Sequence, residues 1–331
     1  MRESDENRIL LGRTVILLLA WFAFIVAIVG LTVRFAPVIN HLELVVVALS
    51  PYLMLAAVVA FGLLWRIGER RWAVLALVPL AVGVGLKLPI YLRDSHPGGA
   101  TLPIRVLTVN VHDGGARPTA IAAAARAHAD VVLLQELDPT QAAALLDEPG
   151  LTGDFPYSAF DARPHAAGVG ILSRYPIVQR SRITGYQLGA TTATLRPAGA
   201  AADVLVATIH LAGPWPQPID RWRAEIDALP ETLKNLALAA GDGAAIVGGD
   251  FNATTDFRPF RRLLDTGFGD AVEQSGGGLA RTYPADSWVP PLIGIDHILT
   301  YDSWAGDSGQ VQVAGTDHLG LTATIHVPAK G

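Results

Sequence analysis

The sequence contains no cysteine, and this absence excludes several kinds of chemistry. A disulfide framework, a thiolate nucleophile and a cysteine-ligated zinc site are all ruled out. A cysteine-free chain is compatible with either side of a bacterial membrane, so the absence does not indicate a compartment.

Lysine is scarce after the first hundred residues, and basic residues form no run there. Residues 101–331 hold 16 Lys and Arg against 24 Asp and Glu, a net charge of -8, whereas residues 1–100 hold 9 against 6, a net charge of +3. This asymmetry implies two regions with different solvents. Proteins that grip a long polyanion usually carry a basic stripe, so the balance argues modestly against nucleic acid as a partner. Five arginines could still line one groove: Arg221, Arg223, Arg258, Arg261 and Arg262.

Long hydrophobic runs are confined to the first hundred residues. Residues 14–33 and 44–65 are each long enough to cross a hydrocarbon core of roughly 30 Å, and residues 72–91 form a third, weaker run with Pro79 as a tolerated kink. A cleaved signal peptide is the alternative for the first run, but the two runs that follow it disfavour that interpretation. We therefore predict an N-terminal bundle of three transmembrane helices in a membrane domain of residues 1–93.

The distribution of arginine predicts an orientation for this multi-pass domain, which we expect in the cell membrane. Short cytoplasmic loops carry an excess of Lys and Arg. Only Arg34 lies between the first two runs, whereas basic residues gather at the N-terminus and between runs two and three: Arg2, Arg8, Arg13, Arg66, Arg70 and Arg71. The third helix should then exit outward and leave the rest of the chain extracytoplasmic. The prediction inverts if the third run does not cross.

The remainder of the chain has the pattern of one α/β domain. Residues 94–102 include a Pro-Gly-Gly sequence and are predicted to be a linker, and residues 103–331 have a normal size for one domain. We expect mixed α/β structure with at least one sheet covered on both faces. The expected strands are 104–109, 130–135, 168–173, 191–195, 204–209, 244–247, 295–300, 311–314 and 321–326, and the expected helices are 119–128, 141–146, 219–238 and 257–264.

Polar residues recur at the ends of these apolar strands. Strand ends on one edge of a sheet can converge on a single crevice even when they are far apart in the sequence. Six repeats of the arrangement are hard to explain by chance. The residues concerned are Asn110, Glu136, His210, Asp250 with Asn252, Asp296, and Asp317 with His318.

Each of these side chains suits a role in phosphate chemistry. Carboxylate and carbonyl oxygens bind hard ions such as Mg²⁺, and Glu136 is the best ligand candidate because it follows a buried strand. Asn110 could hold a ligand or a phosphate oxygen, although a lone Asn at a strand end is more often a turn residue.

Two of the motifs suit proton transfer. On an extended backbone Asp250 and Asn252 would point to the same side, where they could hold a hydrolytic water and a phosphate; a glycine turn with a capping Asp is the alternative. His318 could exchange a proton while Asp296 orients it. His210 could donate to the phosphate. The other histidines considered, namely His112, His165, His297 and His326, are expected to be structural.

Taken in order, the motifs resemble the endonuclease/exonuclease/phosphatase superfamily over about residues 103–327. The matching segments contain Asn110, Gln135–Glu136, Gly170–Pro176, Thr208–Leu211, Gly249–Asn252, Arg281–Pro284, Ile295–Ile298 and Thr316–His318. The resemblance implies a four-layer α/β/β/α sandwich of two packed mixed sheets, as in pancreatic-type deoxyribonuclease, and hydrolysis of a phosphoester by in-line attack of water with Mg²⁺, or Mn²⁺, as cofactor.

The resemblance also implies residue roles. Glu136 corresponds to the principal metal ligand, with Asn110 and Asp317 near the same ion. Asp250 corresponds to the residue that orients or deprotonates the water, and Asn252 to a phosphate ligand. His210 and His318 correspond to the catalytic histidines and Asp296 to the partner of His318. This sequence departs from the family pattern in two respects: Thr316 replaces the usual Ser, and no acidic partner for His210 can be placed.

The sequence therefore predicts a membrane-anchored, bacterial, divalent-metal-dependent phosphoesterase. Its substrate could be a lipid headgroup, a nucleic acid or a small phosphodiester, and its other partner is the lipid bilayer; no protein partner is predicted. One alternative is an endonuclease acting on extracytoplasmic nucleic acid, and another is a catalytically silent receptor or scaffold. Trp215 and Trp288 lie in Pro-rich segments that could stack on a base or insert into lipid, or could be stiffened surface loops.

Overall fold

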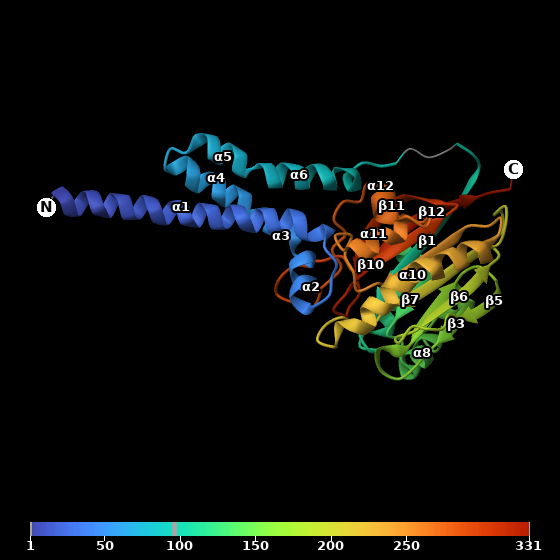
Figure 1. Cartoon of the computed structure of the whole chain (residues 1–331). Helices are drawn as coiled ribbons and strands as arrows, with labels where there is room; N and C mark the ends of the chain where they lie inside the picture. Colours follow the sequence, from blue (N-terminus) through green and yellow to red (C-terminus); the bar gives the residue numbers. More distant parts are fainter. Residues whose placement is uncertain (1, 95–97, 331) are drawn as a thin grey trace. The chain divides into compact units, whose positions relative to one another are not determined.

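The chain forms two compact units. The computed structural model describes residues 2–94 and 98–330, with the side chains of residues 2–6 left out, so residues 95–97 of the expected linker lie outside it. One unit runs to Leu88 and includes Asp256–Arg258, and the other comprises Pro89–Thr255 and the chain from Pro259 onward. Figure 1 shows the first as helices alone and the second as sheets with helices.

The first unit is a helical bundle. Its longest helix is α1, and the rest of the chain folds back in shorter pieces. The elements are α1 (Arg2–Thr32), η1 (Val33–Phe35), α2 (His41–Ala48), α3 (Ser50–Leu53), α4 (Ala56–Arg66), α5 (Arg70–Ala76) and α6 (Val78–Lys87), followed by η2 (Leu88–Tyr91).

Packing in the helical unit places small side chains inside and large apolar side chains outside. Ala20, Ala60 and Ala73 are fully buried, while Leu18 and Phe22 are mostly exposed. Small residues at helix contacts with large apolar residues outward are typical of helices that pack in lipid, where apolar side chains gain nothing by turning inward.

Two helices of this unit are long and apolar enough to cross a membrane, and a third crossing requires a bent pair to count as one. The two helices span Asn7–Phe35 and Arg70–Tyr91. The second predicted run instead forms His41–Ala48 and Ser50–Arg66, which meet at 63°. Pro51 explains the break, because proline lacks the N–H that would continue the preceding helix.

The second unit contains two six-stranded mixed sheets. The first has the order β11-β12-β1-β2-β4-β3, and the second the order β5-β6-β7-β8-β10-β9. Each sheet has one parallel pair near its centre, β1–β2 in the first and β7–β8 in the second, and its other pairs are antiparallel. The strands are β1 (Thr101–Asn110), β2 (Val131–Gln135), β3 (Tyr157–Asp161), β4 (Val169–Ser173), β5 (Ile177–Arg182), β6 (Ala190–Leu195), β7 (Val204–His210), β8 (Ala245–Asp250), β9 (Gly269–Asp270), β10 (Asp296–Tyr301), β11 (Trp304–Gln312) and β12 (Leu319–Pro328).

The main core lies between the two sheets. Leu133 and Ile171 of the first sheet meet Val206, Ile246 and Ile298 of the second in one buried cluster. Each such side chain contributes about 1.5–3 kcal/mol when it leaves water. The sheets approach closely at Gly248, where an added Cβ would lie 2.6 Å from Leu133 Cδ1.

Helices cover the outer faces of the sheets. Ile121 of α7 and Leu145 of α8 pack in a second core with Leu107 and Leu134 of the first sheet. On the second sheet lies α10, whose apolar residues from Ile219 to Leu236 are buried at helical spacing (Figure 1). The helices of this unit are α7 (Pro118–His128), α8 (Pro139–Leu146), α9 (Leu151–Asp154), α10 (Ile219–Ala240), α11 (Arg258–Leu264), α12 (Ala271–Ser275) and η3 (His165–Ala167).

The predicted pair of packed mixed sheets is confirmed, and several strand boundaries are corrected. Strands β3, β5 and β9 were not predicted: all three lie at sheet edges, β3 and β5 are not fully buried, and β9 has only two residues. The strand expected at 311–314 was placed too late, since β11 ends at Gln312. β1 begins three residues earlier than expected and pairs with β12 from Thr101 onward.

Candidate active site

The carboxyl ends of the two parallel strand pairs meet at one place. Asn110 pairs with Gln135 at the end of β1–β2, directly before Glu136, and His210 pairs with Asp250 at the end of β7–β8. The Asn110 amide joins the two ends, since Nδ2 donates to Glu136 Oε1 at 2.9 Å and to Asp250 Oδ2 at 3.1 Å. Residues from both sheets therefore form a single site.

Gly249 allows the end of β8 to lie close to β7 at this site. Gly249 has φ of 154°, and a Cβ there would lie 1.8 Å from the carbonyl oxygen of Ile209 on β7. A side chain would force the two strands apart, so only glycine fits.

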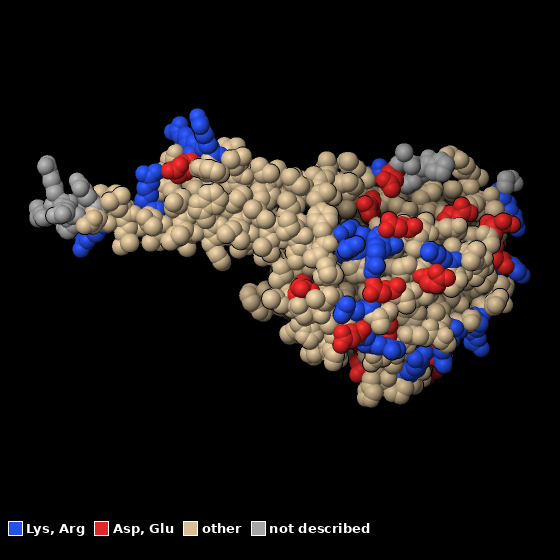
Figure 2. Space-filling model, in the orientation of Figure 1, with Lys and Arg blue, Asp and Glu red and all other residues tan. Residues whose placement is uncertain are grey.

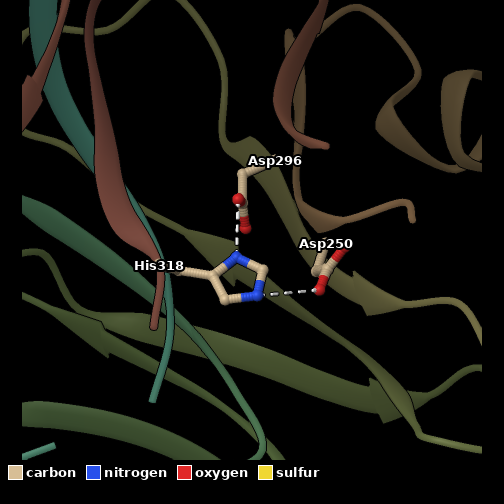
Figure 3. Close-up of side chains that lie close together, drawn as sticks. All are labelled: Asp250, Asp296 and His318. Atoms are coloured by element: carbon tan, nitrogen blue, oxygen red, sulfur yellow. Dashed lines mark hydrogen bonds and ion pairs between the residues drawn. The ribbon is translucent and has the colours of Figure 1, made fainter. Parts of the chain in front are cut away.

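A buried imidazole lies between two carboxylates in this site. His318 Nδ1 is 2.8 Å from Asp296 Oδ2, and His318 Nε2 is 3.8 Å from Asp250 Oδ2 (Figure 3). Asp296 faces Asp250 because β10 runs antiparallel to β8, with these two residues paired. All three side chains are buried.

The surroundings of His318 favour its charged form. Burial lowers the pKa of the imidazole, but the negative charge of Asp296 and its hydrogen bond outweigh burial and raise the pKa to about 10. His318 is thus an imidazolium near neutral pH. Burial raises the pKa of the Asp250 carboxyl, and the nearby charge of Asp296 raises it further.

His210 approaches the same Asp250 oxygen as His318 but has a different electrostatic setting. Its Nε2 is 3.6 Å from Asp250 Oδ2 and 4.0 Å from Glu136 Oε1. Within residues 2–94 and 98–330, no carboxylate hydrogen-bonds its Nδ1. Burial lowers the pKa of His210, and the charge of Asp250 only partly opposes this. His210 is therefore neutral at pH 7, and the acidic partner missing from the sequence is missing from the described structure too.

Asn252 adopts a conformation that the sequence prediction did not foresee. Strand β8 ends at Asp250, and Asn252 has φ of 49°, so the two side chains do not share the face of one extended strand as expected. Asn252 tolerates this left-handed backbone because its short polar side chain bonds locally. Its Nδ2 donates to the Leu211 carbonyl at 3.0 Å, and its backbone N donates to Asp250 Oδ1 at 2.8 Å.

Glu136 and Asp317 lie at the solvent side of the site. Their side chains are 19% and 18% exposed, and both influence His112. Glu136 Oε2 accepts from the backbone N of Asp113 at 2.7 Å, and Asp317 Oδ1 is 2.5 Å from His112 Nδ1. The hydrogen bond to Asp317 raises the pKa of His112. The half-exposed ring of His112, expected to be structural, lies against a carboxylate of the candidate site.

Two groups of side chains in the site have donor atoms that suit a divalent ion. Asp250, Asp296 and His318 present one atom each within 4.8 Å of one another, but all three are buried, and Asp296 and His318 are already hydrogen-bonded to each other. A hard ion such as Mg²⁺ keeps several waters, which requires a position open to solvent. Glu136 and Asp317 meet that requirement, so the chemistry of the donors favours the more open group.

Three other histidines expected to be structural have structural contacts or are exposed. His297 is buried, with Nδ1 2.8 Å from Asp270 Oδ2 and Nε2 2.9 Å from the Ala253 carbonyl. The ring of His326 stacks on Trp304 at 4.1 Å between centroids. His165 is almost fully exposed, 4.0 Å from Asp113.

Two residues that contact His318 were given no role in the sequence analysis, although both lie in motifs noted there. The ring of Tyr283 lies 5.0 Å from that of His318, and burial raises the pKa of its hydroxyl. Thr316 Oγ1 donates to the Asn110 carbonyl at 2.7 Å and accepts from His318 N at 3.1 Å. Thr316 thus ties β1 to the segment that carries His318, using the hydroxyl that Ser would also supply.

Comparisons with known proteins agree with this architecture. A family model described as "Endonuclease/Exonuclease/phosphatase family" matches residues 107–318. No match to a curated protein sequence was found.

Three solved structures share the fold at low sequence identity. TDP2 from D. rerio in complex with a single-strand DNA product is 16% identical with a TM-score of 0.54, covering 67% of this chain and 98% of its own. The 3′ phosphatase NExo from Neisseria, bound to a product DNA hairpin, is 20% identical with a TM-score of 0.54, covering 66% and 98%. A family protein from Bacteroides thetaiotaomicron is 16% identical with a TM-score of 0.52, covering 69% and 98%.

Proposed function

Because this chain belongs to the endonuclease/exonuclease/phosphatase family, we propose that it is a membrane-anchored, divalent-metal-dependent phosphoesterase. The observation that carries the proposal is the position of Asp250, between a neutral histidine and a charged one at the joined ends of two sheets. The proposed catalytic domain is residues 103–331, taken as the four-layer sandwich of the family, after a membrane domain of residues 1–93 and a linker of residues 94–102.

Hydrolysis follows from the roles of four side chains, with Asp296 supporting one of them. Asp250 accepts a proton from a water molecule, the water oxygen forms a new bond to phosphorus, and the bond from phosphorus to the leaving oxygen breaks in line with it. His318, charged and held by Asp296, stabilises the negative charge on the phosphoryl oxygens and can supply the proton for the leaving oxygen. His210 donates a hydrogen bond from its neutral ring. Asn252 positions the phosphate.

A divalent ion would be held by Glu136 and Asp317 with the side-chain amide oxygen of Asn110. Mg²⁺ or Mn²⁺ bound there would neutralise phosphate charge and polarise the phosphoryl group. The ion-pair partners of the site carboxylates are all histidines among the described residues, which leaves excess negative charge for a cation to balance.

Membrane anchoring is supported by the helical unit. Arg13 and Glu69 form an ion pair at 2.8 Å, which places the start of α1 and the α4–α5 turn at the same end of the bundle. Figure 2 shows basic side chains gathered at that end. Counting the bent pair as one span gives three crossings, with both arginine-rich segments cytoplasmic and the catalytic domain extracytoplasmic.

Nucleic acid hydrolysis is the second candidate, because two structural neighbours were solved with DNA products. The net charge of -8 over residues 101–331 counts against it. On the face of the sheet-containing unit in Figure 2, basic and acidic side chains are intermixed. A silent receptor is disfavoured, since each matched catalytic position holds a competent residue.

The test is turnover by the full chain in vesicles, with Mg²⁺ and then with EDTA. A chromogenic phosphodiester, single-stranded DNA and phospholipid are offered separately. We expect turnover that EDTA abolishes and Mg²⁺ restores. Asp250→Asn should lose about 10³-fold in kcat, because it cannot accept the proton. Full activity of that variant would refute the assignment.

Metal binding has its own readout. Calorimetric titration with Mn²⁺ should show binding that weakens in Glu136→Gln. The control is Glu148→Gln, a change outside the site. Equal affinity in both variants would contradict the proposed ligand.

A further inference from the structure

A loop of residues 284–292 leaves the active site and carries the most exposed tryptophan of the chain. Trp288 is 96% exposed, and Leu292 near the end of the loop is also exposed. The loop closes on Tyr283, whose carbonyl accepts from the backbone N of Leu292 at 2.9 Å and of Ile293 at 3.0 Å. The closed base holds the tip away from the core.

The base of this loop is built into the catalytic machinery. The backbone N of Ala285 donates to the Asp317 carbonyl at 2.6 Å. The ring of Tyr283 leans on that of His318. Any surface that the loop contacts is therefore brought next to the reacting phosphate.

The segment that leads into this loop is bonded to the chain emerging from the last candidate membrane helix. That helix runs from Arg70 to Tyr91. The backbone N of Gly278 donates to the Ile90 carbonyl at 2.8 Å, and an added Cβ at Gly278 would meet the Tyr91 ring at 2.6 Å. Asp94 N donates to the Gln274 carbonyl at 3.0 Å. These bonds lie within the sheet-containing unit, which begins at Pro89, and they join its first residues to the segment that leads into the loop.

A second loop with the same character starts at the other catalytic histidine. Residues 211–218 follow His210, and Trp215 within them is 61% exposed. The buried Glu225 anchors the start of this loop by accepting from Ala212 N at 2.8 Å. Both loops are rich in proline and contain no Lys or Arg; Asp286 is their only charged residue.

This composition suits one surface in particular. Tryptophan concentrates at the interface between water and hydrocarbon, where its ring is apolar and its N–H stays wet. Proline lowers the entropy lost when a loop is ordered on a surface. A nucleic acid would call for cationic groups beside the aromatic ring, which both loops lack.

We propose that the loop 284–292, aided by Trp215, inserts into the headgroup layer of the bilayer that holds the protein, and that the hydrolysed phosphoester is presented there by a lipid. This inference rests on the proposed function for its substrate and on the loop geometry for its membrane contact. The site then draws its substrate from the membrane surface.

The absence of cysteine allows a direct test on the full chain. Trp288→Cys introduces a single thiol that can carry a polarity-sensitive nitrobenzoxadiazole label. Leu238→Cys is the matched control, because Leu238 is an apolar residue 78% exposed at the far end of α10. Ser287→Cys labels the same loop while keeping Trp288. The proteins are reconstituted in phosphatidylcholine–phosphatidylglycerol vesicles, with or without brominated acyl chains.

The labels at positions 288 and 287 should emit at shorter wavelength than the label at 238 and be quenched by brominated chains. Water-like emission at all three positions would overturn the proposal. A blue shift at 288 that requires added single-stranded DNA would overturn it in favour of nucleic acid.

Turnover separates this inference from the proposed function. If the soluble phosphodiester is hydrolysed but the labels stay exposed to water, the phosphoesterase proposal stands and the proposed insertion of the loop is refuted. Quenched labels in a protein that hydrolyses no phosphoester would support the membrane-inserting loop and contradict the phosphoesterase proposal. Hydrolysis of phospholipid by the unlabelled full chain supports both.

Discussion

Among the described residues, two buried histidine–aspartate pairs are joined by a hydrogen bond, and only one lies in the candidate active site. His318 and Asp296 are 2.8 Å apart, and so are His297 and Asp270. Asp296 and His297 are neighbours in sequence on β10, so one strand contributes a residue to each pair. The pairs are equal in chemistry, distance and burial.

The difference lies at the second ring nitrogen. His318 Nε2 faces the Asp250 carboxylate, whereas His297 Nε2 is 2.9 Å from the Ala253 carbonyl, with the rings of Phe251 and Phe260 against its imidazole. A backbone carbonyl satisfies a proton donor and completes a structural bond. A carboxylate next to the substrate position leaves the proton available for chemistry. Burial and pairing alone thus do not identify a catalytic histidine.

The largest effect is expected from breaking the catalytic pair. Asp296→Asn removes the charge that keeps His318 protonated, so kcat should fall by about 10³-fold, within the range for loss of acid–base catalysis. The free energy of unfolding should also fall, by about 2 kcal/mol, because a buried charge-assisted hydrogen bond is weakened, so turnover is measured well below the melting temperature. Turnover of the chromogenic phosphodiester measures kcat, and unfolding followed by circular dichroism measures stability. Wild-type turnover would show that Asp296 does not support catalysis.

The matched change in the other pair should act mainly on stability. Asp270→Asn weakens a buried, charge-assisted hydrogen bond and should lower the free energy of unfolding by about 2 kcal/mol. The α12 N-cap survives, because Asn can still accept from Val272 N and Glu273 N. We expect kcat within a few fold of wild type, measured well below the melting temperature. A loss of activity as large as that of Asp296→Asn would erase the distinction between the pairs.

The Asp161 carboxylate extends the comparison, because its partners are arginines rather than a histidine. Burial raises the pKa of Asp161, but hydrogen bonds from Arg163 and Arg182 outweigh burial and lower it below 3.8. The stabilisation is therefore present above pH 3.8 and is lost as the pH falls through the depressed folded value. Asp161→Asn should lower the free energy of unfolding at pH 7 by about 1 kcal/mol, a modest value because Arg182 is mostly exposed.

Urea unfolding at several pH values measures this effect. The difference in free energy of unfolding between wild type and Asp161→Asn should become smaller as the solution is acidified below pH 3.8. Asp203→Asn is a suitable control, because Arg196 pairs with Asp203 on the surface and the change should cost less. A difference at Asp161 that grows toward acid would contradict the assigned direction of its pKa.

Much of the site was predictable because it follows strand ends. Asn110, Glu136, His210 and Asp250 each close a buried apolar strand, a local pattern that a sequence displays directly. The two packed sheets were expected through the resemblance and are confirmed. Which residues act in catalysis remains a proposal supported by their convergence.

What could not be predicted depends on backbone turns and on long-range partners. The left-handed backbone at Asn252 and the contact of His112 with Asp317 arise only when distant segments meet. The pairing of His297 with Asp270 likewise depends on the position of β9 beside β10. Edge strand β5 escaped notice because it lacks a buried face.

Because Gly248 has no side chain, the two sheets can pack closely at this position. Leu133 of the facing sheet occupies the room that even one methyl group would need. The residue lies two positions before Asp250, so the thickness of the sandwich at this point sets how far Glu136 and Asn110 stand from Asp250 across the gap. A displacement of about 1 Å in a reacting group can lower the rate by about 10²-fold. Core packing at this position should therefore affect the rate of the proposed reaction. An alanine at position 248 would therefore force Leu133 or the strands themselves to shift directly below the candidate site.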